Sequence, residues 1–484
     1  MQRHVQMDSL AGVGAQAPRS DLPGLRALGL GLSFVGGPAQ AQWLLEPHSP
    51  LGSAWAWSLT ILTVLLLLLV AIYSLRHYVF SLNRLFGDQR HPYASIVSAD
   101  WPRVTVLVAA HNEESVIADC LRNLMGVDYP VERMLVMPVN DRSSDRTREI
   151  IEAVAAEHPG RIRPFHRTGG KPGKAAALKD ATEQVETEFI IVFDADYLPS
   201  RGLIRRLMAP FVDAEVGAVM GRVVPNNVGA NLLTRLLDLE RSGGYQVDQQ
   251  ARMNLGLVPQ YGGTVGGIRL AALRAVGGWH DDVLAEDTDL TYRLLLGGWQ
   301  TVYHNRGECY EEVPQNWSVR VRQIKRWAKG HNQAMVRHSL ALLGSRRLRP
   351  AERIDGLLLL GVYLMAPLLI AGWVLCVLMY FTVGLELAAP ALLLFAFVIH
   401  SSLGNFAAFF EIAAAVHLDR SRQRVRLLAF NWLGFVVSAV AISRAVLEQA
   451  LLDRLPGRGF HWDKTVRYRQ APPAGLVEPS GPAR

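Results

Sequence analysis

The sequence predicts an α/β fold, a Rossmann-like domain inserted between transmembrane α-helices. Between about Arg103 and Arg353, short apolar runs typical of buried strands alternate with segments of helical pattern. Uninterrupted apolar segments, long enough to cross a bilayer, lie on both sides of this region. The composition agrees, because 50% of the 484 residues are hydrophobic and only 19% are charged, a low fraction for a soluble protein.

The charge distribution also favours a membrane protein. The formal net charge is +7, and a basic chain can bind nucleic acid. Here, however, lysines and arginines cluster beside the apolar segments, as on the cytoplasmic face of membrane proteins. We therefore expect membrane lipids as partners and no nucleic acid. The three cysteines, Cys120, Cys309 and Cys376, are too widely spaced to indicate a disulfide framework or a zinc site.

Residues 1–53 form an N-terminal tail that contains one ambiguous segment. Residues 22–41 are rich in Gly, Ala and Leu and end in Ala39-Gln40-Ala41, the pattern of a signal-peptidase site. Arg26 interrupts the apolar part. The segment is therefore a cleaved signal, a weak first span or a surface helix.

Residues 54–76 are the clearest transmembrane helix, with the unbroken core ILTVLLLLLVAIY. No Lys or Arg occurs in residues 42–54, whereas Arg76, Arg84 and Arg90 follow the core. The positive-inside rule then places the following domain in the cytoplasm. We expect a multi-pass protein of the cytoplasmic (inner) membrane with its α/β domain on the cytoplasmic side.

The α/β domain is expected over residues 100–335. The expected strands are Val104–Ala110, Met134–Val139, Phe189–Phe193 and Val216–Val224, and the first two helices are Glu113–Met125 and Asp145–Ala156. Such alternation implies parallel βαβ units. Because no G-x-G-x-x-G follows the first strand, a dinucleotide site of that type is not expected. A nucleotide bound in another way remains open.

The C-terminal third returns to the membrane. Residues 336–356 form a basic segment suited to an anionic membrane surface. Residues 357–450 hold about three apolar segments, namely Leu357–Tyr380, Pro390–Ala414 and Leu427–Leu447. Three crossings would leave the basic tail, residues 451–484, outside the cell, against the positive-inside rule. Either the last segment re-enters or the number of spans is different.

Two carboxylates follow the strand Phe189–Phe193 directly. Side chains two residues apart on an extended segment project to the same side, so Asp194 and Asp196 can face one cation. The ends of such strands are also where α/β sheets bind ligands. A helix cap or a turn is the structural alternative, because Asp is common in both.

Four further polar motifs follow expected strands or begin expected helices. They are Ala109–Glu114, Asn140–Thr147 with Asp141, the glycine-rich basic loop Gly169–Leu178 with Lys171 and Lys174, and Ala285–Leu290 with Glu286 and Asp287. The glycine-rich loop is either a phosphate cradle or a surface turn. The carboxylates of the last motif would also suit the first turn of any helix. A basic helix then carries Gln323–Trp327, whose alternative role is a solvated or membrane-facing surface.

Taken together, these motifs resemble those of the membrane-bound family 2 glycosyltransferases, which include cellulose, hyaluronan, poly-N-acetylglucosamine and β-glucan synthases. The resemblance covers about Val104–His331. It rests, in chain order, on Asp141, the D-A-D of Asp194–Asp196, Glu286-Asp287 and the Q-x-x-R-W of Gln323, Arg326 and Trp327. It implies a GT-A glycosyltransferase domain and an inverting transfer of sugar from a nucleotide-sugar.

The resemblance also implies a role for each donor-site residue. Asp141, with the turn from Ala110 to Glu113, would contact the nucleotide base or ribose. Asp194 would hold the nucleotide-sugar and, with Asp196, ligate Mg²⁺ or Mn²⁺, which prefer oxygen ligands.

On the acceptor side, Asp287 would be the general base that takes the proton from the acceptor hydroxyl. Arg326, with Lys174, would neutralise the leaving diphosphate. Trp327 would stack on the acceptor sugar, and Glu286 and Gln323 would line the substrate site.

The sequence departs from the family's pattern at two places. Ala285 precedes Glu286-Asp287 where Thr is usual, and Tyr261–Leu270 stands where the cellulose enzymes carry F-F-C-G-S. The second change argues against cellulose as the product. We expect a processive synthase that extends a β-linked polysaccharide from UDP-glucose or UDP-N-acetylglucosamine and couples this to export, with no export partner identified. The alternatives are a non-processive transferase acting on a membrane lipid and a non-catalytic membrane scaffold.

Overall fold

The computed structural model describes residues 50–98, 100–382, 406–451 and 468. The ambiguous segment 22–41 and residues 390–405 of the predicted segment Pro390–Ala414 lie outside the described residues, as does the basic tail apart from Leu451 and Tyr468.

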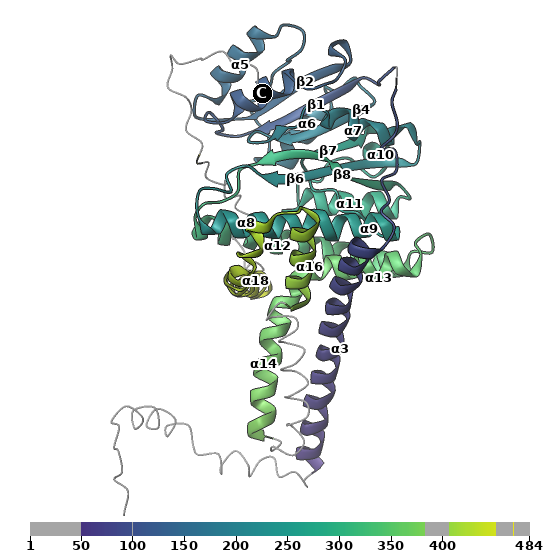
Figure 1. Ribbon diagram of the computed structural model, residues 1–484, viewed down its shortest axis with the longest axis vertical. Coiled ribbons are helices and arrows are strands. Elements are labelled where there is room, and N and C mark those ends of the chain that lie inside the picture. The colour runs from purple at the N-terminus through teal and green to yellow at the C-terminus, as the bar shows by residue number, and fades with distance from the viewer. Residues whose placement is uncertain (1–49, 99, 383–405, 452–467, 469–484) are drawn as a thin grey trace, which may run out of the picture.

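Within the described residues the α/β domain is built on one sheet of eight strands (Figure 1), in the order β3-β2-β1-β4-β7-β6-β8-β5. The strands are β1 (Val104–Ala110), β2 (Met134–Asp141), β3 (Phe165–Arg167), β4 (Phe189–Asp194), β5 (Leu198–Pro199), β6 (Val216–Pro225), β7 (Gly266–Arg269) and β8 (Gln300–Glu311).

The strands β3, β2, β1 and β4 are parallel, as expected for βαβ units. The rest of the sheet is mixed, because β7 runs antiparallel to both β4 and β6, and β5 runs antiparallel to β8. The chain leaves the sheet after β6 through α8 (Leu232–Ser242), the π-helix η3 (Gly243–Gln249) and α9 (Gln250–Leu255). It then returns to the sheet as β7, between β4 and β6.

Helices cover both faces of the sheet. The helices α4 (Ile117–Met125), α5 (Thr147–Glu157) and α7 (Leu203–Met208) cover one face, and α6 (Lys174–Thr182), α10 (Leu270–Ala275) and α11 (Glu286–Leu296) cover the other. In β1, Val106 and Val108 belong to the first core and Leu107 to the second, as the alternation of a strand requires.

The predicted elements are close to the observed ones. The strand β1 has the predicted bounds, but α4 begins at Ile117 and not at Glu113. Glu113 instead belongs to the loop between β1 and α4, and its backbone N–H donates to the hydroxyl of Thr147, the first residue of α5, at 2.7 Å.

Among the described residues, three apolar helical segments are long enough to cross a membrane: Ala54–Phe86, Val362–Met379 and Gln423–Leu451. The first belongs to α3 (Pro50–Phe86), and the second to η4 (Val362–Leu364) with α14 (Met365–Thr382). The third contains most of α17 (Arg422–Val425), η5 (Leu428–Phe430) and α18 (Asn431–Leu451). A shorter apolar helix, α16, covers Phe406–Leu418. The chain is therefore membrane-associated.

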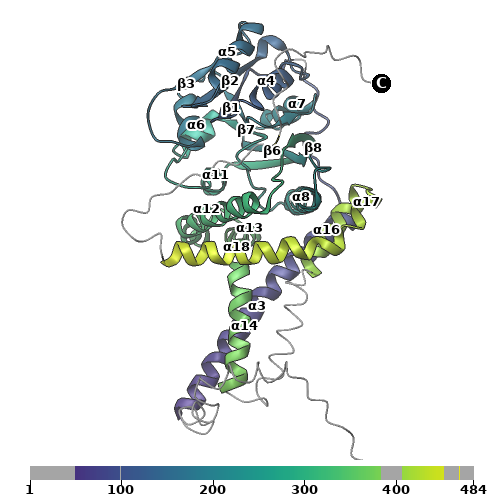
Figure 2. The ribbon, with the colours of Figure 1, turned by 90° about the vertical axis from the view of Figure 1, so that its left-hand side faces the viewer.

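The apolar helices do not all run in one direction. Figure 2 shows α3 and α14 projecting from the same side of the α/β domain, whereas α18 runs crosswise to them beneath it. Leu66 and Val70 of α3 pack against Leu369 and Cys376 of α14. The predicted segment Leu357–Tyr380 is divided, because α13 (Pro350–Leu360) ends before η4 begins.

Buried ion pairs fasten the domain to the membrane helices. Arg76 of α3 donates to Asp248 of η3 at 3.0 Å and to Asp355 of α13 at 2.9 Å. Just after α16, Asp419 forms an ion pair with Arg222 of β6 at 3.0 Å and accepts a hydrogen bond from Ser242, the last residue of α8, at 2.6 Å. Because breaking such a buried pair is costly, the domain is held in one position over the helices.

Candidate active site

Three strand ends meet at one edge of the sheet. In the parallel ladders, Ala110 of β1 is opposite Asn140 of β2, and Ala109 is opposite Asp194 of β4. The last residues of these strands are therefore neighbours, and these are the predicted site residues Ala110, Asp141 and Asp194. This is the edge at which open α/β sheets bind ligands.

Asp141 is buried and holds the glycine-rich loop in place. Its carboxylate accepts from Arg167 Nη1 at 2.6 Å, from Arg142 Nε at 3.0 Å and from the Gly173 N–H at 2.9 Å. The same two guanidinium groups donate to carbonyl groups of the loop, Arg142 to Gly170 and Arg167 to Lys171. Asp141 therefore shapes the loop, and its predicted contact with a nucleotide stays a prediction.

Lys174 is the first residue of α6, and its side chain points to the carboxylates. Its Nζ lies 2.6 Å from Asp194 Oδ1. Burial by itself lowers the pKa of Lys174, but the charges of Asp194, Glu286 and Asp287 outweigh this effect and raise the pKa. The ammonium group therefore stays charged at the centre of the site.

A tight loop between α9 and β7 connects the D-A-D sequence with α11. The Asp194 N–H donates to Thr264 Oγ1 at 3.1 Å. Gly263 has a φ of +72°, and a Cβ there would lie 3.0 Å from the Cβ of Asp287. The glycine thus allows the loop to pass directly against the predicted base.

Glu286 and Asp287 open α11 and complete the cluster of carboxylates. Burial raises the pKa of Glu286 to about 7; the charge of Lys174 opposes this, whereas Asp287 and Asp194 add to it. Asp287 Oδ1 accepts from the Thr288 N–H at 2.6 Å, which fixes the side chain on the first turn. Four predicted site residues, Lys174, Asp194, Glu286 and Asp287, are thus within electrostatic reach of one another.

The helix α12 (Trp317–Gly344) carries the Q-x-x-R-W sequence and passes close to this cluster. A Cβ on Gly330 would lie 2.6 Å from the Cβ of Ala285, the residue before Glu286. The Leu284 N–H also donates to Gln333 Oε1 at 2.9 Å. The predicted acceptor helix therefore packs directly against the residues that precede Glu286 and Asp287.

Trp327 belongs to α12, and its ring contacts arginines of both α8 and α12. The guanidinium carbons of Arg241 and Arg320 each lie over its ring at 5.2 Å from the centroid. Arg320 also donates to Gln323 Oε1 at 2.9 Å, and Arg326 is half-buried. Stacking of a sugar on Trp327 stays a prediction.

The structure adds residues that no sequence motif marked. Glu311, at the end of β8, accepts from Arg241 and from the Tyr197 hydroxyl, the latter at 2.8 Å. Gln260 donates to the Thr288 hydroxyl at 3.0 Å. Their partners lie from 28 to 114 residues away in the chain, so spacing alone could not have revealed them.

The donor set fits a divalent cation with oxygen ligands. Asp194 and Asp196 are hard oxygen donors, and Asp196 is buried. In the part of the chain that the structure describes, no three His, Cys, Asp or Glu side chains gather as a complete protein-only metal site.

Residues 102–330 match the protein family described as "Glycosyltransferase like family 2". Two curated proteins illustrate the similarity. The "Probable glycosyltransferase YdaM" of Bacillus subtilis is 34% identical over 243 residues, which cover 50% of this chain and 57% of the relative. A "Beta-monoglucosyldiacylglycerol synthase" of Synechocystis sp. is 32% identical over 234 residues, 48% of each chain. The similarity thus spans only about half of the length of these relatives.

A solved structure shows the same fold. The mannosyltransferase PcManGT from Pyrobaculum calidifontis, in complex with GDP-Man and Mn²⁺, superimposes with a TM-score of 0.51 at 22% identity. The superposition covers 83% of this chain and 99% of that one. The protein therefore has a GT-A-like mixed α/β sheet flanked by apolar helices, which confirms the predicted fold class.

Proposed function

We propose that this protein is a nucleotide-sugar-dependent, inverting hexosyltransferase that transfers a sugar to the hydroxyl group of a membrane glycerolipid such as diacylglycerol. The observation that carries this proposal is the gathering of Lys174, Asp194, Glu286 and Asp287 at the ligand-binding edge of a GT-A-like sheet, in a membrane-associated chain. The names of the monoglucosyldiacylglycerol synthases support a lipid acceptor better than the polysaccharide product expected first.

The donor would bind along the ends of β1, β2 and β4. The loop held by Asp141 presents the N-terminus of α6 and the Lys174 ammonium group, which are suited to a diphosphate. Asp194 and Asp196 would hold a divalent cation, which would supply positive charge against the phosphates. UDP-glucose is the donor we would test first.

Transfer would need one displacement. Asp287 would take the proton of the acceptor hydroxyl, and the hydroxyl oxygen would attack the anomeric carbon while the bond to the diphosphate oxygen breaks. Lys174 and Arg326 would stabilise the departing diphosphate. Because the attack comes from the face opposite the leaving group, an α-linked donor would give a β-linked product.

Product analysis in liposomes tests this proposal. The purified protein would be reconstituted with diacylglycerol and given UDP-[¹⁴C]glucose and Mg²⁺ or Mn²⁺. We expect an organic-extractable β-glucosyl lipid of one sugar. Long glycosidase-sensitive chains would restore the polysaccharide reading and contradict the lipid acceptor.

The role of Asp287 needs a matched control. The variant Asp287→Asn should lose transfer while still binding the donor, whereas Asp128→Asn should keep full activity. Asp128 forms its ion pair with Arg205 at 3.0 Å on the surface, and its side chain is 47% exposed. Equal activity of both variants would show that Asp287 is not the base.

A further inference from the structure

The helix α18 exposes a row of apolar side chains. These side chains are spaced four, four, seven and four residues apart, which places them on one face of the helix. Their residues are between 48% and 68% exposed, although all are large and apolar. The members of this apolar stripe are Trp432, Val436, Val440, Leu447 and Leu451.

The opposite face of α18 is small and polar, and it packs against the protein. Ala441 and Ala445 are buried. Glu448 forms an ion pair with Lys325 of α12 at 2.9 Å, and Gln449 accepts from Asn332 of α12 at 3.0 Å. The helix is therefore two-sided, whereas a helix surrounded by lipid would be apolar on all sides.

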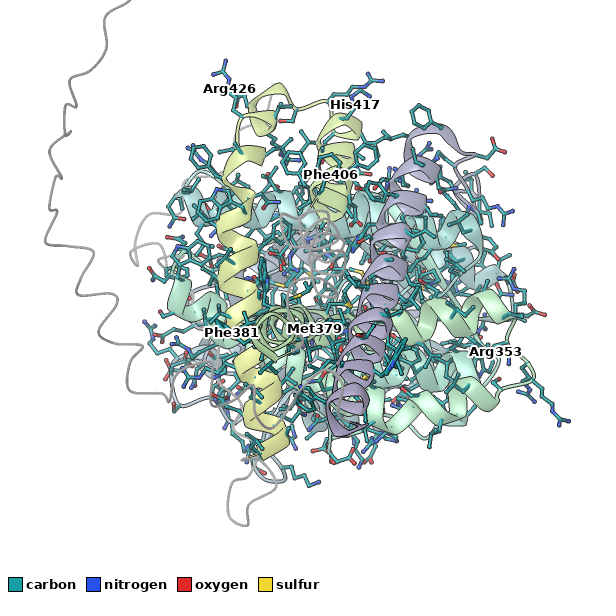
Figure 3. All side chains as sticks on the ribbon, turned by 90° about the horizontal axis from the view of Figure 1, so that it is seen from below. Arg353, Met379, Phe381, Phe406, His417 and Arg426 are labelled. Atoms are coloured by element: carbon teal, nitrogen blue, oxygen red, sulfur yellow. The ribbon has the colours of Figure 1, made fainter. Side chains whose placement is uncertain are left out.

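The direction of α18 differs from that of the other long apolar helices. In Figures 1 and 2, α3 and α14 run away from the domain, while α18 lies across their direction at the domain's lower side. Seen from below in Figure 3, α14 is viewed end-on near Met379, and α18 extends lengthwise across the view from the side of Arg426. If α3 and α14 cross the membrane, α18 lies along its surface.

We propose that α18 is an in-plane membrane helix whose apolar stripe inserts among the acyl chains of the leaflet beneath the catalytic domain. This rests on the membrane placement in the proposed function and goes beyond it. The occupant of the stripe is lipid, because α3 and α14 enter the bilayer from the same face. Arg426 before α18 and Arg444 within it are both exposed and suit anionic headgroups.

An in-plane α18 also removes the conflict with the positive-inside rule that three membrane crossings would create. By length and composition the segment Gln423–Leu451 could cross a bilayer. An in-plane α18 instead keeps both of its ends on the side of the catalytic domain. The arginines before the helix and Leu451 at its end are then on the same side, as the positive-inside rule favours for a basic flank.

Depth measurements with nitroxide labels test this placement. Trp432→Cys, Val440→Cys and Leu451→Cys would be labelled singly in the full chain and reconstituted in liposomes, with wild type as the background for the buried native cysteines. If α18 is in-plane, the three labels lie at the same shallow depth. If α18 spans the bilayer, the label at 440 lies about 12 Å deeper than the label at 432, at about 1.5 Å per residue.

The helix α3 provides the control. Trp57 and Leu65 are 65% and 59% exposed, and they lie near the end and near the middle of residues 54–76, so their labels should differ in depth by about 12 Å in a spanning helix. A label at 440 that is deeper than both its neighbours overturns the proposal, and so do three labels that are fully exposed to water. The depths are independent of catalysis, so a failed transfer assay and a failed placement are distinguishable.

Discussion

A buried carboxylate behind the site offers the sharpest test of how α11 is held. Asp289 lies two residues after Asp287, and its side chain is fully buried. It accepts from His338 Nε2 at 2.8 Å and from Arg293 Nε at 2.7 Å, and its Oδ2 lies 2.9 Å from His280 Nδ1. Burial by itself raises the pKa of Asp289, but these partners outweigh it and hold the pKa well below its usual value. The stability that Asp289 contributes is therefore fully present at neutral pH and is lost only as the pH falls below about 4, the usual value for Asp.

The perturbation is Asp289→Asn, which keeps the shape and one acceptor oxygen but removes the charge. Removing one partner of a buried ion pair costs about 3–5 kcal/mol. Since Asn retains part of the hydrogen bonding, we expect a loss of about 3 kcal/mol, which corresponds to about 6–12 °C in melting temperature for a domain of this size. Because α11 carries Glu286 and Asp287, the transfer rate should fall as well.

The assay is thermal unfolding of the purified protein in detergent at neutral pH, followed by circular dichroism. Asp282→Asn is the matched control, because Asp282 also forms an ion pair with an arginine, Arg337 at 2.7 Å, but its side chain is 56% exposed. Its loss should stay within about 0.5 kcal/mol. A melting temperature of Asp289→Asn within about one degree of wild type would refute the reasoning, since it would mean that the buried charge contributes no net stability.

Three further predictions concern other parts of the molecule. Lys174→Met should lower kcat/KM for the donor about a hundredfold, measured with UDP-[¹⁴C]glucose, because it removes the cation proposed to stabilise the diphosphate; an unchanged value contradicts this role. Gly330→Ala should destabilise the protein by about 1–3 kcal/mol in thermal unfolding, because the new Cβ would lie 2.6 Å from Ala285, whereas Gly344→Ala, which meets nothing within 4 Å, should not. Burial and nearby cations lower the pKa of His304 to about 4, so acidification from pH 7 to 4 should cost wild type about 3 kcal/mol that His304→Asn does not lose; parallel pH–stability curves would exclude this.

Local pattern predicted the parts of the fold that depend on apolar strands. The strand β1 was predicted to the residue because its buried side chains form one unbroken run. By contrast, β7 contains two glycines among four residues, and β8 includes His304, Asn305 and Arg306, so neither looks like a strand. Their pairing with β6 depends on tertiary contacts that a window of sequence does not contain.

The candidate site also contains residues that a motif predicted and residues that only tertiary contacts reveal. Asp194, Glu286 and Asp287 stand in motifs whose spacing predicted that they belong to one site, and the structure places them within electrostatic reach of one another. The partners of Asp141 could not be predicted, because Arg167 is the last residue of a three-residue strand that carries no motif. The direction of α18 could not be predicted either, because an in-plane helix and a spanning helix of similar length can have similar mean hydropathy.

The π-helix η3 sets the rotational register between the membrane helices and the active site. Its neighbouring residues point in different directions: Asp248 binds Arg76 of α3, and Gln249 exchanges hydrogen bonds with the backbone of Gln260. A π-turn holds about one residue more than an α-turn. Deleting a single residue within Gly243–Gln249 would therefore turn everything that follows by about 100° relative to α8. The seven residues of η3 thus set the rotation of α9 relative to α8. A chain shortened by one residue could keep the contact of Asp248 with α3 or the contact of Gln249 with Gln260, but not both.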